Sequence, residues 1–261
     1  MAFDGITTKM VVNELTNTLI NSRVEKIYVP NRNEIWLCLH TQDRKNVKLL
    51  ISIDANNCRL HLSNENRNNP EKAPQFCMVL RKYLIGAKLL SISQIGLDRI
   101  VNLTVETIDD FGDIVKKTLA VELMGKYSNI ILLDNEKIID SIRHVDITMS
   151  SVREVLPSKK YIMPTSLGKY DFLTTSDEKF LKIVREAISK SEFESIAITN
   201  LLSSLFVGFS KNFVATICNL VNIAPELEKS QIIDDLILKI YSKISEIIED
   251  IAKNKISLTF N

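Results

Sequence analysis

The sequence is poor in cysteine and histidine, and the spacing of these residues excludes the common metal and disulfide frameworks. The four cysteines form no C-x-x-C pair, and three lie in apolar runs where a free thiol packs as a small hydrophobic group. The three histidines show no H-x-x-x-H spacing, so a metal site would have to be assembled from distant residues. We therefore expect no metal, no cofactor and no structural disulfide.

Segments that direct a protein to a membrane are also lacking. Residues 1–9 contain no basic stretch followed by an apolar one, and no uninterrupted apolar run approaches the ~20 residues of a membrane-spanning helix. We expect a cytoplasmic protein with no membrane span. A location at the cell surface would require unconventional export.

The formal net charge of +1 hides a difference between two parts of the chain. Residues 1–170 hold 23 of the 33 Lys and Arg and 19 of the 32 Asp and Glu, which leaves 10 and 13 for residues 171–261. A basic front part permits contact with phosphates but does not demand it, because non-specific affinity for nucleic acids comes from clustered Lys and Arg. Local clusters of Lys and Arg, and not the net charge, therefore decide whether the chain can bind phosphates.

The first part of the chain predicts one helix and two sets of strands. Apolar residues recur at helical spacing over residues 6–20, and Asp4 suits the N-cap. A first β set is predicted at 24–29, 34–40, 47–53 and 58–62. A second β set is predicted at 88–95, 100–106, 114–122, 129–134 and 137–141.

Between the two sets, residues 75–85 predict an amphipathic helix that begins after Pro74. Arg81 and Lys82 would form a local basic face on it. Simple solvation of the helix is the alternative reading of these two adjacent charges.

Two polar turns interrupt the second β set. Residues 96–99 include Asp98 and Arg99, which cannot both lie on a solvent face of one strand, so we interpret this segment as a turn. Residues 122–128 again bring together Glu, Gly, Lys and hydroxyl groups. Taken alone, Asp98 and Arg99 are explained by a surface turn, and we expect the two turns to lie at the same end of the sheet.

Beyond the second β set the pattern becomes helical. Helices are predicted at 177–190, 193–205, 210–221 and 225–256, and Ser210 suits an N-cap. The last of them has a spacing that suits the start of a coiled coil. We predict an α+β fold: a β-rich domain with a mixed sheet or sandwich and flanking helices over 1–172, then an all-α domain over 173–261.

Five ordered segments of the first 170 residues together resemble the N-terminal part of the bacterial fibronectin-binding protein A family, also called RqcH, of the NFACT group. They are residues 1–5 (MAFDG), 26–30 (KIYVP), 74–82 (PQFCMVLRK), 98–100 (DRI) and 122–130 (ELMGKYSNI). Residues 201–221 look like the family's helix-hairpin-helix region. The resemblance implies an NFACT-N domain, similar to the N-terminal fold of formamidopyrimidine-type glycosylases, followed by that region and the start of a coiled coil.

The resemblance also implies a function in ribosome-associated quality control. Such a factor binds a large ribosomal subunit that carries an obstructed peptidyl-tRNA and holds an alanine tRNA there, so that the stalled chain gains a C-terminal alanine tail. Bond formation would belong to the ribosome. We therefore expect no catalytic residues in this chain, and it is not expected to be an enzyme.

The family's tRNA contacts map onto the two polar turns. By resemblance, the tRNA-binding residues are Asp98, Arg99, Glu122, Leu123, Met124, Gly125 and Lys126. Arg offers a planar fork to phosphate or a base edge, and Asp accepts from the amines of unpaired bases. Gly125 would let the backbone approach RNA, and Lys126 would supply charge. We expect auxiliary RNA contacts from Asp4, Arg81, Lys82, Tyr127 and Ser128.

One residue departs from the family pattern, because Tyr127 stands where members commonly carry His. Tyr stacks and forms hydrogen bonds but cannot become a cation, so the resemblance does not support a charged role at this position.

Two other classes of function compete with this interpretation. The older family name implies an adhesin that binds fibronectin, which strand addition at a sheet edge would support and the missing leader opposes. The glycosylase-like fold suggests DNA glycosylase chemistry, but those enzymes need an N-terminal Pro amine followed by Glu, and Ala2-Phe3 occupies that place. Without the nucleophile we do not expect glycosylase activity.

Overall fold

The computed structural model describes residues 3–66, 68–164 and 168–255, and the chain divides into two compact units. The sheet unit comprises the described residues of 14–95 and 99–165. The helical unit comprises the described residues of 1–13, 96–98 and 166–261. The α+β class expected from the sequence is confirmed by this combination of a large sheet with helices. The predicted domain division after residue 172 stays a prediction.

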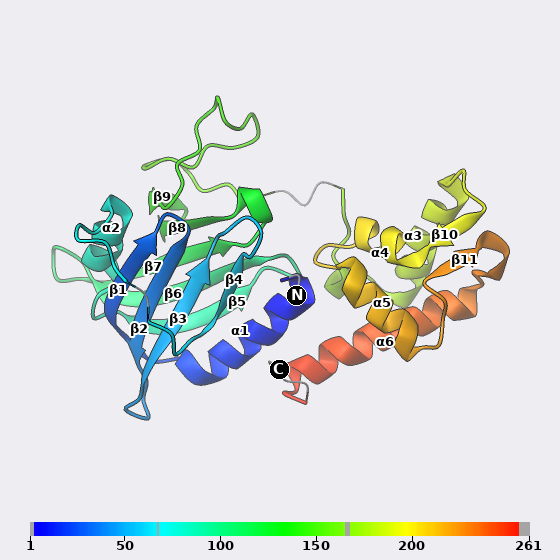
Figure 1. The fold of residues 1–261 in the computed structure, drawn as a ribbon, viewed down its shortest axis with the longest axis horizontal. Helices are drawn as coiled ribbons and strands as arrows, with labels where there is room; N and C mark the ends of the chain where they lie inside the picture. The colour runs from blue at the N-terminus through cyan, green and yellow to red at the C-terminus, as the bar shows by residue number, and fades with distance from the viewer. Residues whose placement is uncertain (1–2, 67, 165–167, 256–261) are drawn as a thin grey trace. The chain divides into compact units, whose positions relative to one another are not determined.

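The sheet unit contains one nine-stranded sheet in the order β4-β3-β2-β1-β5-β6-β7-β8-β9 (Figure 1). Its strands are β1 (Arg23–Asn31), β2 (Glu34–His40), β3 (Asn46–Ser52), β4 (Arg59–Leu62), β5 (Lys88–Gln94), β6 (Ile100–Ile108), β7 (Ile114–Glu122), β8 (Asn129–Asp134) and β9 (Lys137–Ser141). Helix α2 (Gln75–Leu84) lies between β4 and β5 in the chain. The strand pattern therefore follows both predicted β sets.

The prediction of a mixed sheet is wrong, because all paired strands of the described residues are antiparallel. Most consecutive strands are joined by short turns, which permit only antiparallel pairing, whereas a parallel pair needs a crossover of a dozen or more residues. The two β sets are joined at a single register pair, Arg23 with Lys88. In the view of Figure 1, β1–β3 are drawn in front of β6–β8.

The helical unit is built around a single aromatic and aliphatic core. Its helices are α3 (Asp177–Lys190), α4 (Ile198–Leu205), α5 (Lys211–Leu220) and α6 (Asp234–Ala252), and α1 (Gly5–Leu19) begins in this unit. Phe172, Phe180 and Phe206 are buried at its centre with ring centroids 4.9–6.1 Å apart. The isoleucines of α6 join this core, so the apolar stripe that suited a coiled coil is buried within the unit. A coiled coil beyond α6 stays a prediction.

Two of the predicted helices are too long at their N-terminal ends. Residues 195–197 and 226–228 form the short paired strands β10 (Ser195–Ala197) and β11 (Glu226–Glu228) instead of helical turns. Ile196 is buried in the core and pairs with Leu227, which is partly buried against the same core, so the pairing places both apolar side chains on the core. Residue 256, the predicted end of the last helix, lies outside the described residues.

Helix starts follow the expected caps. The Thr7 amide donates to Asp4 Oδ1 at 2.8 Å, and the Phe213 amide donates to Ser210 Oγ at 3.0 Å, so both predicted N-caps are confirmed. The Ser210 hydroxyl also donates to the other Asp4 carboxylate oxygen. Asp4 therefore begins α1 and ties it to the start of α5.

A close backbone crossing explains two glycines of the helical unit. The Gly5 amide donates to the Gly208 carbonyl at 2.8 Å. A Cβ added at either glycine would lie about 2 Å from the carbonyl oxygen of Leu97. Gly208 also has φ +77°, which other residues rarely adopt. Three chain segments thus meet where no side chain fits.

No helix in the described ranges is long and apolar enough to cross a membrane.

Candidate nucleic-acid interface

The two polar turns lie at the same end of the sheet, as expected. Ile100 at the start of β6 pairs with Glu122 at the end of β7, and the Leu123 amide donates to the Arg99 carbonyl at 2.9 Å. Residues 96–99 form a turn between β5 and β6, which confirms that prediction. Asp98 and Arg99 are each half-buried. Arg99 thus lies directly beside the second turn.

The second turn presents only part of its sequence to solvent. Lys126 and Tyr127 are exposed, and Gly125 is half-buried with φ +60°. The Met124 amide donates to the Ser128 hydroxyl at 2.8 Å, and Ser128 is buried. The buried Ser128 hydroxyl therefore stabilises the turn by its hydrogen bond to Met124, while Lys126 and Tyr127 form the exposed tip of the turn.

Glu122 and Leu123 are fully buried, so neither side chain is placed to touch RNA directly. Arg153 holds the Glu122 carboxylate with both terminal nitrogens, Nη1 at 2.7 Å from Oε1, and the Tyr161 hydroxyl donates to the same Oε1 at 2.9 Å. Burial and the adjacent Glu122 charge raise the pKa of Tyr161. Burial is the largest single influence on Arg153 and lowers its pKa, but the hydrogen bonds to Glu122, the Glu122 charge and Tyr161 together outweigh it, so the Arg153 pKa is raised.

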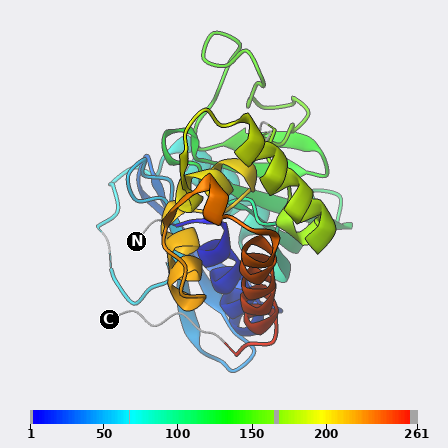
Figure 2. The same ribbon diagram turned by 90° about the vertical axis from the view of Figure 1, so that its right-hand side faces the viewer.

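This buried network anchors a projecting loop beside the second turn. The loop of residues 145–163 stands out from the sheet in Figures 1 and 2. Arg153 Nη1 also donates to the Ile162 carbonyl at 2.9 Å, and Val145 pairs with Val155. Glu122 therefore fixes both the end of β7 and the base of this loop.

Arg143, which the sequence did not single out, is bonded to three other segments of the chain at this end of the sheet. Its Nη1 donates to the carbonyls of Lys126 and Ser128, each at 3.3 Å. Its Nη2 donates to Asn33 Oδ1 at 2.7 Å and to the Ile53 carbonyl at 3.2 Å. Arg143 thus holds the Lys126 turn against the turns that follow β1 and β3.

Further basic and amide groups line hollows at the same end. Arg32 and His144 line one hollow together with Arg143, and Arg32 and Arg59 line a second. His144 Nε2 lies 2.7 Å from Oδ1 of the buried Asp140, which orients the imidazole. Sequence reasoning missed these residues, although Arg32 stands in a predicted turn between strands.

The proposed auxiliary residues have structural partners of their own. Asp4 belongs to the helical unit, where both its oxygens accept the hydrogen bonds described above. Arg81 donates from Nε and Nη2 to the Ile27 carbonyl at 3.0 and 2.9 Å. Lys82 pairs with Asp110 at 2.9 Å, and this hydrogen bond raises the Lys82 pKa. Arg81 therefore holds α2 against β1, and Lys82 ties α2 to the loop between β6 and β7.

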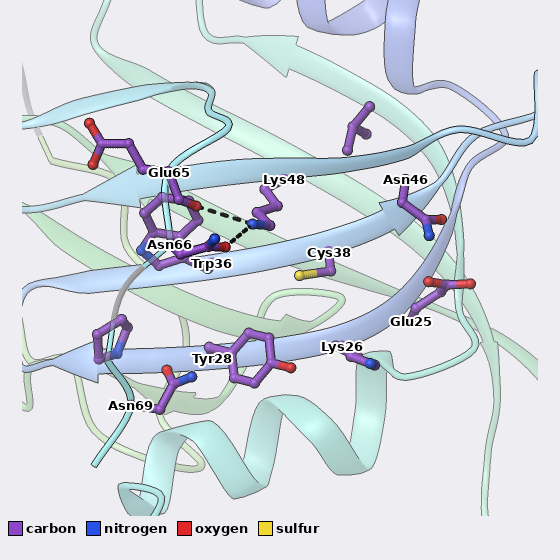
Figure 3. Close-up of a pocket in the computed structure, with 12 residues that line it drawn as sticks. Glu25, Lys26, Tyr28, Trp36, Cys38, Asn46, Lys48, Glu65, Asn66 and Asn69 are labelled. Atoms are coloured by element: carbon purple, nitrogen blue, oxygen red, sulfur yellow. Dashed lines mark hydrogen bonds between the residues drawn. The ribbon is translucent and has the colours of Figure 1, made fainter.

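A separate hollow lies on the outer face of β1–β3 (Figure 3). Tyr28, Trp36 and Cys38 line it, and Lys48 Nζ donates to the Glu65 carbonyl at 3.1 Å and to Asn66. Burial raises the pKa of the Cys38 thiol, which disfavours the reactive thiolate. Neither polar turn contributes a residue to it.

Residues 4–261 match the family model described as NFACT N-terminal and middle domains. The chain is 37% identical over 214 residues to the "Rqc2 homolog RqcH" of Streptococcus pneumoniae serotype 2, which covers 81% of this chain and 37% of that protein. It is 39% identical over 186 residues to the "Rqc2 homolog RqcH" of Streptococcus suis, which covers 70% of this chain and 34% of that protein. The chain thus spans little more than a third of these relatives.

A solved structure has a similar fold. It is the N-terminal part of the fibronectin/fibrinogen-binding protein of Streptococcus suis, with a TM-score of 0.78 and 33% sequence identity. The alignment covers 94% of this chain and 85% of that one. The likeness therefore extends over both units of the chain.

Proposed function

The chain belongs to the NFACT family, as its sequence resemblance indicated, and we propose that it is the tRNA-binding module of a ribosome-associated quality-control factor. Relatives of this family carry the names Rqc2 and RqcH. In this proposal the full-length protein acts in the cytoplasm on large ribosomal subunits with an obstructed peptidyl-tRNA. It holds alanine tRNA there, and the ribosome adds the alanine tail.

The observation that carries the proposal is the gathering of cations from separate loops at one end of the sheet. Arg99 and Lys126 stand on adjacent turns. Arg32 and Arg59 line hollows at the same end, where Arg143 joins the loops. Acidic residues share the linings of these hollows: Glu34, Asp54 and Asp140. Clustered cations on a fixed framework are what a phosphate backbone requires.

The roles of the residues divide by exposure. We assign direct contacts to Asp98, Arg99, Lys126 and Tyr127, with Gly125 allowing close approach of the backbone. Lys126 Nζ lies 4.9 Å from the centre of the Tyr127 ring, so charge and a stacking surface occur together. Buried Glu122, Leu123 and Ser128 position the turn, with Met124 between them. No catalytic role is proposed for any residue.

Filter binding to bulk tRNA between 50 and 200 mM salt, with the full-length protein, tests the proposal. Arg99→Ala and Lys126→Ala should each weaken binding about threefold to tenfold and reduce the salt slope by about one. Asp98→Ala combined with Arg99→Ala should abolish binding. Lys116→Ala is the matched control, because this exposed lysine lies on β7 away from the turns.

Sedimentation with purified large ribosomal subunits tests the ribosomal part. Wild-type protein should co-sediment with subunits that carry peptidyl-tRNA. Full-length protein that binds neither tRNA nor large subunits would rule the proposal out.

Fibronectin binding is the alternative, and the name of the similar Streptococcus suis protein favours measuring it. Strand addition would use an edge of the sheet, and β4 is one of its two edge strands. Fibronectin affinity that survives the Asp98 and Arg99 changes, in a protein without detectable tRNA binding, would support the adhesin.

A further inference from the structure

The hairpin of β6 and β7 carries an exposed apolar tip at the end away from the candidate RNA turns. Ile108 pairs with Ile114 at this tip, whereas Ile100 pairs with Glu122 at the other end. A nine-residue strand separates the two ends by roughly 26 Å. Phe111 is 92% exposed, and Ile108 and Ile114 are 70% and 73% exposed. The β6–β7 hairpin thus has an apolar tip at one end and the candidate RNA turns at the other.

The tip is a fixed turn. Asp109 Oδ1 accepts from the amides of Phe111 and Asp113, each at 2.9 Å. The Asp109 amide donates to the Asp113 carbonyl at 3.0 Å, and the Gly112 amide donates to the Asp109 carbonyl at 3.1 Å. Phe111 is therefore held outward by a hydrogen-bonded loop, which lowers the entropy that binding would cost.

Helix α2 extends the apolar surface beside the tip. The Lys82–Asp110 ion pair ties the tip to α2 at 2.9 Å, and Figure 1 shows α2 and the β6–β7 loop at the same end of the sheet. Met78, one turn before Lys82 on α2, is 55% exposed, and Ile85, the C-cap residue that follows the helix, is 47% exposed. Exposed apolar residues gathered in this way mark an interaction surface.

Charge selects the class of partner. Residues 106–116 carry four acidic side chains and one lysine. With Lys82 of α2, which pairs with Asp110, the surface keeps a net charge of −2. Such a surface repels RNA phosphates and anionic lipid, and a two-fold contact between two copies would set acid against acid. The apolar rings need an apolar counterpart, so the fitting partner is a protein surface with cations around an apolar pocket.

We propose that the acidic, apolar tip of the β6–β7 hairpin, with the exposed face of α2, docks on a basic protein of the large ribosomal subunit while the opposite end of the hairpin contacts tRNA. The inference rests on the proposed ribosomal function. Proteins that neutralise ribosomal RNA carry Lys and Arg for that purpose, so such a particle offers the complementary charge. Phe111 is the expected anchor.

Photo-cross-linking tests the inference directly. The full-length protein with Phe111→p-benzoylphenylalanine is bound to purified large subunits, irradiated, and treated separately with ribonuclease and protease. We expect a cross-link to one basic ribosomal protein. The control carries the same residue at Phe193, which is 76% exposed and also flanked by acidic residues, Glu192 and Glu194.

Several results would overturn the inference. One is a cross-link from position 111 to ribosomal RNA, to another part of the same chain or to a second copy of the chain. Another is the absence of any cross-link from protein that is bound to the subunit. The third is an equally strong cross-link from the Phe193 control to the same ribosomal protein. Phe111→Ser should weaken subunit binding at least fivefold and leave tRNA affinity unchanged. Unchanged subunit binding by Phe111→Ser refutes the docking alone, whereas wild-type protein that does not sediment with subunits refutes the proposed function as well.

Discussion

Arg153 and Glu122 form a two-pronged ion pair in which the carboxylate is fully buried and the arginine side chain is 13% exposed. The two residues are 31 positions apart in the chain. One lies at the end of β7 beside the candidate RNA turn, and the other lies in the loop of residues 145–163. The pair therefore links the position of the turn to the position of the loop.

Removing Arg153 should destabilise the protein strongly. Arg153→Ala leaves a buried carboxylate without its cation, which costs about 3–5 kcal/mol of unfolding free energy. Urea denaturation measures this loss. Glu136→Ala is the control, because the Glu136–Lys160 pair is 77% and 71% exposed and should contribute less than about 1 kcal/mol. A cost for Arg153→Ala as small as that of the control would contradict the structural role of the pair.

Tyr161 should make stability depend on pH in the alkaline range. Burial and the Glu122 charge raise its pKa in the folded state, so the folded protein holds the phenolic proton more tightly than the unfolded chain does. This stabilisation is complete below the unfolded pKa of about 10 and is lost as pH rises from there towards the folded-state pKa.

The measurement is urea unfolding from pH 8 to pH 11 of wild type and Tyr161→Phe. The variant should be less stable at pH 8 by about 1 kcal/mol, the usual contribution of one hydrogen bond. The difference should shrink above pH 10. A difference that is constant across the range would mean that the Tyr161 pKa is not raised.

The strands and several turns could be predicted from sequence because their signals are local. β2, β7, β8, β9 and α3 begin and end at the predicted residues, since alternation and helical spacing are properties of neighbouring residues. The position of the two polar turns at the same end of the sheet could also be predicted, because consecutive antiparallel strands reverse direction and every second turn therefore lies at the same end.

The partners of the site residues could not be predicted, because they lie far away in the sequence. Glu122 is flanked by apolar residues, but it accepts a hydrogen bond from Tyr161, which lies 39 positions later in the chain. Arg143 donates to Asn33, which lies 110 positions earlier. A glutamate between two apolar residues indicates that it is buried itself. The sequence resemblance had instead assigned Glu122 to RNA contact. The short strands β10 and β11 escaped notice because three residues carry too little periodicity.

Gly208 should be the glycine least tolerant of substitution. In Gly208→Ala the new Cβ would lie 1.9 Å from the Leu97 carbonyl oxygen at a φ of +77°, so backbone must move, and we expect a loss of about 3 kcal/mol or more. Gly112→Ala is the control, with φ +91° and nothing within 4 Å of the added Cβ. It should cost only about 1–2 kcal/mol from backbone conformation. Equal losses in chemical denaturation would contradict a steric role for the crossing.

Tyr127→His should make tRNA binding depend on pH. Tyr127 is 70% exposed beside Lys126, and an exposed histidine titrates near pH 6.5, so its cation would add one phosphate contact in acid. The ratio of variant to wild-type affinity should rise about threefold to tenfold between pH 7.5 and 5.5. Tyr127→Phe keeps the ring without a titrating group and should give a flat ratio. A flat ratio for Tyr127→His as well would mean that position 127 does not approach a phosphate, and Lys126 would then remain the contact that this turn makes.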